Sequence, residues 1–190
     1  MSNLTENMFV EAALENSHNL EMTVQLVKSF PDIVDRVVVT FIQELESQLR
    51  KEFPVPDWEI TNELVKGNKL NRKRWQPLKV KKTAWGQRYF MYLGFDSDNL
   101  VNLDFCFSKG APSDPSVQNI PGLADDLTKA FGRGKGATRH VEWWLRYDKP
   151  YITWNADCIL LLQGDNMQQS LDMFINDFKK LSNIAEKYIG

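Results

Sequence analysis

The spacing of apolar residues divides the chain into a helical beginning, a strand-rich middle and a helical end. Between residues 32 and 53, apolar side chains recur every four residues, at Ile33, Val37, Phe41, Leu45 and Leu49. This period predicts one amphipathic helix of about 20 residues. The sequence PVP at 54–56 is expected to end it, because proline cannot continue a helical hydrogen-bond ladder.

Residues 4–30 show two further apolar patches with helical spacing, but their phases do not join. A break is therefore expected near Asn16–Asn19. Pro31 is expected to interrupt the pattern and is also tolerated in the first turn of a new helix. We predict an N-terminal helical arm over residues 1–30, followed by a single α+β domain over residues 31–190.

The middle of the chain changes to the period of two that is typical of strands. In LVNLDFCFS at 100–108, Leu103 and Phe105 alternate with Asp104 and Cys106, which predicts a half-buried antiparallel strand. Pro77 marks an edge strand or a bulge within residues 74–85. Other strands are expected at 58–64, 87–95, 138–148 and 156–165, with a loop at 109–122 and a short helix at 123–131.

The last segment, residues 166–189, carries a heptad pattern of apolar positions. They are Met167, Leu171, Phe174, Phe178, Leu181, Ala185 and Tyr188. Such a stripe packs on the sheet or on the helix at 32–53, or it forms the interface of a homodimer.

These elements predict an α+β fold with five or six mostly antiparallel strands and two long helices on one face. Apolar runs of about five residues are too short to span a bilayer, and the N-terminus lacks the basic start of a secretory signal. Cys106 and Cys158 lie in apolar runs, where buried free thiols are common. A cytoplasmic location is therefore expected, without a membrane partner.

Motifs for catalysis or metal binding are not found. His18, Cys106, His140 and Cys158 are too scattered for a zinc site. The sequence GRGKGATR at 132–139 lacks the order of a phosphate-binding loop, so its glycines are expected to serve a turn. No catalytic residue, cofactor or metal ligand is predicted, and an enzyme with a site near His140 and Glu142 is the third alternative.

Positive charge is concentrated in two windows, 66–82 and 132–140, which hold 11 of the 23 basic residues and none of the 25 acidic ones. One interpretation is a solvated edge strand, since lysines discourage pairing of exposed edges. The other is a nucleic-acid surface, in which basic groups hold phosphates and a tryptophan stacks on a base. The candidate residues are Lys66, Lys69, Arg72, Lys73, Arg74, Trp75, Lys79, Lys81, Lys82, Arg133, Lys135 and Arg139.

The segments RKRW at 72–75 and WWLRY at 143–147, together with the order of elements, resemble the region that follows the catalytic core in some bacterial and phage proteins of the PD-(D/E)XK nuclease superfamily. The resemblance covers residues 33–189 and implies an accessory region from a mobile element or a defence system. It does not imply cleavage. The nearest match to the nuclease motif, Asp177-Phe178-Lys179, lies in a helix rather than on a strand, which is the wrong element for that site.

We therefore expect a non-enzymatic protein that binds nucleic acid, or a complex that handles nucleic acid, through the basic residues. The alternative is a protein–protein interaction module, similar to an inhibitor or an antitoxin. It would use the acidic surface or the helix with the heptad pattern.

Overall fold

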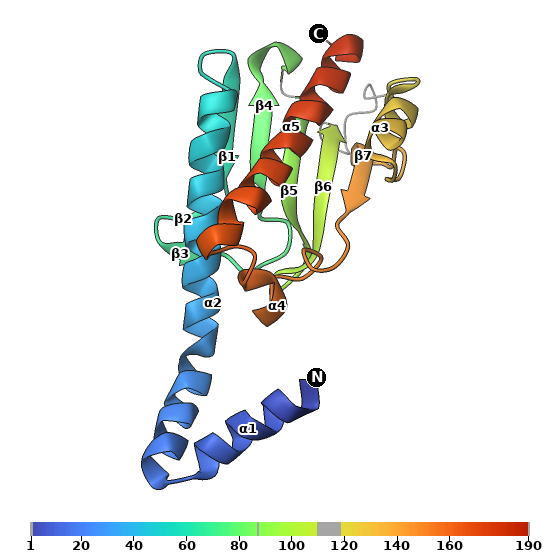
Figure 1. Ribbon diagram of the computed structural model, residues 1–190. Coiled ribbons are helices and arrows are strands. Elements are labelled where there is room, and N and C mark those ends of the chain that lie inside the picture. Colours follow the sequence, from blue (N-terminus) through green and yellow to red (C-terminus); the bar gives the residue numbers. More distant parts are fainter. Residues whose placement is uncertain (1, 87, 110–118, 190) are drawn as a thin grey trace. The chain divides into compact units, whose positions relative to one another are not determined.

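A computed structural model of the protein describes residues 2–86, 88–109 and 119–189 (Figure 1). The chain separates into two compact units, Met1–Arg36 and Val37–Gly190. The second unit is an α+β domain built on an antiparallel sheet, which confirms the predicted fold class. A long helix runs from the first unit into the second.

The first unit consists of α1 (Ser2–Leu14) and the first part of α2 (Ser17–Glu52). The helices are separated at residues 15–16, where a break was expected. The Asn19 backbone N–H donates to Asn16 Oδ1 at 2.9 Å, and its side-chain amide donates to the carbonyl of Ala12 at 3.0 Å. Asn19 thereby ties the start of α2 to the end of α1.

Pro31 does not interrupt the helix, so that expectation was wrong: α2 continues through it. Proline removes one hydrogen bond to the carbonyl four residues earlier, at Val27. Val27 is 67% exposed. Water can therefore bind that carbonyl, and the lost bond leaves no buried polar group without a partner.

The sheet has the order β1-β4-β5-β6-β7, and every neighbouring pair is antiparallel. The strands are β1 (Trp58–Asn62), β4 (Leu78–Lys82), β5 (Tyr89–Ser97), β6 (Val101–Lys109) and β7 (Val141–Arg146). A separate hairpin joins β2 (Val65–Lys66) to β3 (Lys69–Leu70). β4 lies inside the sheet, so the predicted edge at this strand was wrong. Pro77 precedes β4 and does not interrupt its pairing.

The predicted strand at 156–165 was also wrong, because this run forms α4 (Ala156–Ile159) and the 3-10 turn η2 (Gly164–Asn166). The Asn155 side chain caps α4 by accepting from the backbone N–H groups of Asp157 and Cys158. The run is still buried, with Cys158 at 0% exposure. A short apolar run suits either element equally well. Of the loop expected at 109–122, residues 110–118 lie outside the described residues.

Three helical segments of the second unit cover one face of the sheet (Figure 1). They are the later part of α2, α3 (Leu123–Phe131) and α5 (Met167–Ile189). Phe105 of β6 meets Phe178 of α5 with ring centroids 4.9 Å apart, and Phe41 of α2 meets Phe174 of α5 at 5.9 Å. These rings form the centre of the core.

The heptad stripe of α5 packs within one chain, the first of its two predicted interpretations. Leu171, Phe174, Phe178 and Leu181 are at most 1% exposed. Met167 and Tyr188, at the ends of the stripe, are partly buried. Within residues 2–86, 88–109 and 119–189, no helix combines the length and the apolar content that crossing a membrane requires.

Candidate functional site

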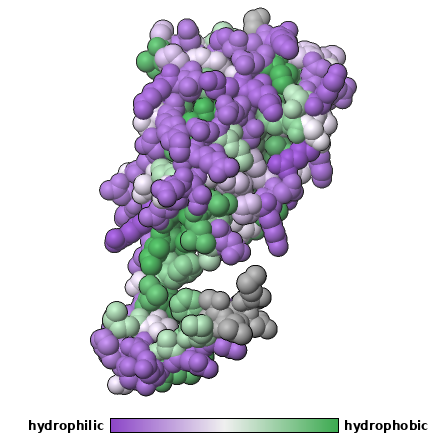
Figure 2. Space-filling model, in the orientation of Figure 1, coloured by the Kyte–Doolittle hydropathy of each residue, from purple (hydrophilic) through white to green (hydrophobic). Residues whose placement is uncertain are grey.

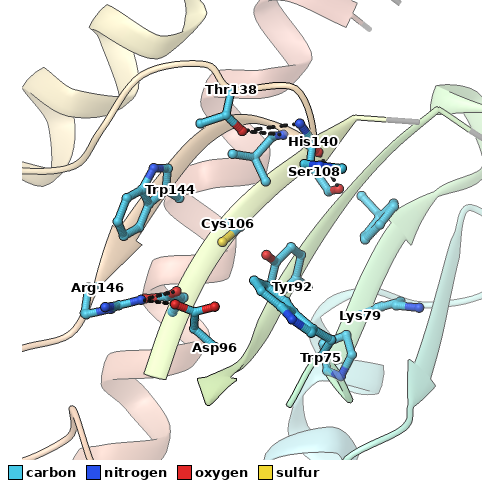
Figure 3. Close-up of a pocket in the computed structure, with 14 residues that line it drawn as sticks. Trp75, Lys79, Tyr92, Asp96, Cys106, Ser108, Thr138, His140, Trp144 and Arg146 are labelled. Atoms are coloured by element: carbon cyan, nitrogen blue, oxygen red, sulfur yellow. Dashed lines mark hydrogen bonds and ion pairs between the residues drawn. The ribbon is translucent and has the colours of Figure 1, made fainter. Parts of the chain in front are cut away.

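The sheet face away from the helices carries a pocket of about 640 Å³ (Figure 3). Alternation along the strands explains its position. Phe105 points to the helices, so its neighbours Asp104 and Cys106 point to the opposite face. The pocket is lined by Trp75, Pro77, Lys79, Phe90, Tyr92, Asp96, Asp104, Cys106, Ser108, Thr138, His140, Val141, Trp144 and Arg146.

Strand register arranges the floor of the pocket in rows. Tyr92 of β5 lies opposite Cys106 of β6, and Cys106 lies opposite Trp144 of β7. Cys106 is only 2% exposed. The polar side of β6 is thus buried as well, which corrects the half-buried expectation. The Trp75 and Thr138 segments stand at the rim and help to cover this face (Figure 3).

Trp75 joins the basic stretch to the pocket. Its backbone N–H donates to the Phe95 carbonyl at 3.0 Å, and the preceding N–H of Arg74 donates to Asp98 Oδ1 at 2.8 Å. Trp75 has a φ of 61°, which is strained for a bulky residue, and its side chain is 51% exposed. The fold therefore holds a large aromatic side chain half in water at the pocket rim, at an energetic cost.

Gly94 of β5 lets the Trp75–Pro77 segment lie close to the sheet. A Cβ atom at residue 94 would lie 3.0 Å from Pro77 Cβ and 3.2 Å from its Cα. Sequence reasoning missed this residue. The available signal was a glycine inside a strand pattern, which often marks a close approach of another backbone segment.

Arg146 forms ion pairs with two carboxylates at one end of the pocket, those of Asp96 and Asp104. The Arg146 guanidinium donates from Nε to Asp104 Oδ1 at 2.8 Å and from Nη2 to Asp104 Oδ2 at 3.0 Å. The same Nη2 also lies 2.7 Å from Asp96 Oδ2. Burial raises the pKa of the Asp104 carboxyl, and the hydrogen bonds from Arg146 oppose that effect.

Replacing Asp104 with asparagine is expected to cost more stability at pH 4 than at pH 7. A carboxyl whose pKa is higher in the folded protein binds a proton there first as the pH falls. Its stabilising contribution is present below the unfolded-state pKa of about 3.9 and is lost as pH rises through the folded-state value. Asparagine does not titrate, so the difference in melting temperature should widen between pH 7 and pH 4. A constant difference would contradict this.

Cys106 and His140 lie at the same pocket, as a nucleophilic pair would require. Burial raises the pKa of the Cys106 thiol well above its usual range, so the thiol stays protonated and is a poor nucleophile at neutral pH. Glu142 is fully buried and does not line this pocket: its Oε2 accepts from the Ile120 N–H at 3.0 Å. The two residues of the enzyme alternative, His140 and Glu142, are therefore not brought to one site.

Seven of the eight basic residues of the first window fall into two groups, and the eighth, Arg74, is exposed and precedes Trp75 in the chain. Lys66, Lys69, Arg72 and Lys73 line a second hollow of about 460 Å³, together with a single acidic residue, Asp98. The Asn99 N–H donates to the carbonyl of Arg72 at 2.8 Å, which holds this loop against the turn between β5 and β6. By formal charge, the four basic residues of this lining outnumber its single acidic residue by three.

The second group consists of the β4 lysines, and each pairs with a carboxylate. The Nζ atom of Lys79 lies 2.8 Å from Glu63 Oε1, that of Lys81 lies 2.7 Å from Glu59 Oε2, and that of Lys82 lies 2.8 Å from Glu186 Oε1. Because β4 is internal and these charges are paired, these lysines neither form a solvated edge nor offer unpaired charge to phosphates.

The second basic window follows α3 and runs beside β7. Arg133 forms an ion pair with Asp148, Lys135 Nζ lies 4.7 Å from the centroid of the Trp144 ring, and Arg139 is exposed. Gly132, at a φ of 68°, caps α3. Gly134, at a φ of 132°, leaves no room for a Cβ atom beside Trp143. Gly132 and Gly134 therefore serve the turn, as predicted.

Across the three described stretches of the chain, no group of three or more His, Cys, Asp or Glu side chains is placed to hold a metal ion. In comparisons with protein-family models, curated proteins and solved structures, nothing matches this chain.

Proposed function

We propose that the protein binds single-stranded nucleic acid without cleaving it. An unpaired base occupies the pocket on the sheet face away from the helices and stacks on Trp75, while backbone phosphates lie on the hollow lined by Lys66, Lys69, Arg72 and Lys73. The observation that carries the proposal is the position of Trp75. It is half exposed and strained, and it lies where the basic loop meets an aromatic pocket.

The pocket suits an uncharged aromatic group better than a phosphate. Its lining includes Asp96 and Asp104, both paired with Arg146, and Lys79, which is paired with Glu63, so the pocket has no excess of positive charge. Phe90, Tyr92 and Trp144 add aromatic surface. A volume of about 640 Å³ is typical of small-molecule pockets. Aromatic side chains bind bases of any kind by stacking, so weak sequence preference is expected.

The basic hollow suits phosphates because positive charge is in excess there. Lys73 of the hollow and Trp75 of the pocket are two residues apart, a separation of at most about 7 Å along the chain. A phosphate and its neighbouring base can therefore engage the two places together. The resemblance to a region that accompanies a nuclease core implies the same kind of role, in which the protein binds and another component acts.

The test compares two double variants of the basic stretch. Lys69→Ala with Lys73→Ala removes charges from the hollow, whereas Lys81→Ala with Lys82→Ala removes lysines that are paired with glutamates. Binding of fluorescent oligo-dT and oligo-rU is followed by anisotropy over a range of salt concentrations. The first variant should reduce the slope of log affinity against log salt by roughly 1.4, or about 0.7 per lost phosphate contact. The control should leave the slope unchanged.

Three results would contradict the proposal. They are salt-independent binding, equal effects of the two double variants, and no binding to either strand at low salt. The labelled strands should also stay intact when magnesium or manganese is added, and their breakdown would overturn the non-cleaving role. Duplex DNA of the same length should bind more weakly than single strands, because its bases cannot enter the pocket.

A further inference from the structure

Exposed apolar side chains are concentrated in the first unit, Met1–Arg36, which is called the arm from here on. Of the fourteen large hydrophobic residues that are exposed among the described side chains, eleven lie in this unit. Figure 2 shows the resulting hydrophobic surface over α1 and the first part of α2. The eleven are Met8, Phe9, Val10, Leu14, Leu20, Met22, Val24, Leu26, Val27, Phe30 and Ile33.

Seven of these residues belong to α2, from Leu20 to Ile33, and they lie on one side of it. At about 100° per residue, the large apolar side chains between Leu20 and Val34 fall within an arc of roughly 200°. The charged residues of this stretch all lie on the opposite arc, namely Glu21, Lys28, Asp32, Asp35 and Arg36. An apolar arc of this width is typical of a helix that is covered on more than one side.

The same apolar spacing is buried in the later part of α2. Farther along α2, Val38, Phe41 and Leu45 continue the apolar spacing and are 0% exposed. In the arm, Leu26 and Val27 keep that spacing at 62% and 67% exposure. The sequence of the arm therefore has the apolar pattern of a core while its side chains remain in contact with water.

We propose that the apolar face of the arm is an interface between two copies of this chain. The seven exposed apolar side chains of α2, at about half exposure, offer roughly 700 Å² per copy, close to the about 800 Å² per partner of a stable interface. Homodimer interfaces are more apolar than other interfaces, and this face lacks charged side chains over residues 20–34. In a two-fold arrangement the same face serves both copies.

Charge argues against an anionic membrane as the occupant. Residues 1–36 hold six acidic and two basic residues, so an anionic lipid surface would repel the arm. Between two copies, the charged arc of α2 would point outward into water, where repulsion is screened. The proposed interface is independent of the pocket on the sheet, because none of the residues that line that pocket belongs to the arm.

The test measures the mass of the full chain in solution by light scattering after size exclusion. The wild-type protein should have twice the single-chain mass of 22.0 kDa. Leu26→Glu with Val27→Glu should halve the observed mass. The control Leu160→Glu changes a residue that is 70% exposed outside the arm, and it should keep the dimer.

Circular dichroism shows whether the double variant is still folded. If the variant is unfolded, the mass of the wild-type protein still tests the proposal. A wild-type mass of one chain at about 100 µM, far above the Kd of a stable homodimer, would overturn the proposal. So would a dimer that survives the double variant, or a larger assembly that grows with concentration, because a two-fold interface closes on itself.

Discussion

Replacing Phe174 with alanine is expected to lower the free energy of unfolding by about 3–5 kcal/mol, the usual cost of deleting a buried aromatic ring. Phe174 is 0% exposed, and its ring centroid lies 5.2 Å from that of Tyr147, 5.5 Å from Tyr151 and 5.9 Å from Phe41. Truncation would leave a cavity among these rings that rigid neighbours cannot fill. Urea unfolding followed by circular dichroism measures the loss.

The same experiment separates core packing from a dimer interface along α5. If Phe174 packs within one chain, Phe174→Ala should lower the free energy of unfolding equally at about 1 µM and about 50 µM protein, because only an intermolecular contact depends on concentration. The comparison is made with Leu26→Glu and Val27→Glu already present, so that contacts between arms do not contribute. A loss below about 1 kcal/mol, or one that changes with concentration, would contradict the core role.

Replacing Trp75 with glycine is expected to weaken single-strand binding by roughly 1–3 kcal/mol, the usual contribution of one stacked base. Stability should not fall. Glycine tolerates the φ of 61° that strains tryptophan, and the half-exposed side chain contributes little to the core. Anisotropy titrations and melting curves on the same samples measure the two effects.

The control variant keeps an aromatic ring at residue 75 and the backbone strain of its positive φ. Trp75→Phe should retain most of the affinity, because a smaller aromatic ring still stacks, and its salt dependence should match that of the wild type. If Trp75→Gly binds as tightly as the wild-type protein, the base does not stack on this residue. If it lowers stability by about 3 kcal/mol or more, Trp75 has the role of a core side chain instead.

The elements that could be predicted from the sequence are those with long, regular patterns. The period of four in α2 and the heptads of α5 run over many residues, and local packing preserves them. Alternation in β6 correctly placed Asp104 and Cys106 on the face away from the core. The short run at 156–165 has no such length, and a local cap at Asn155 decided its conformation.

The pocket itself could not be predicted, because strand pairing creates it. Tyr92 and Trp144 are 52 positions apart in sequence and meet only through their shared neighbour Cys106. The partners of the β4 lysines were hidden for the same reason: Glu186 lies on α5, more than a hundred residues from Lys82. A run of charge in the sequence therefore could not show which lysines are neutralised.

The two native cysteines are buried, so they should react slowly with thiol probes in the folded protein. Burial raises the pKa values of both the Cys106 and the Cys158 thiols, and Cys158 reaches about 12. Reagents that attack thiolates should therefore modify the folded wild-type protein slowly. A cysteine introduced at an exposed position, such as Leu160, would react first, so dyes or spin labels could be attached there without removing either native thiol.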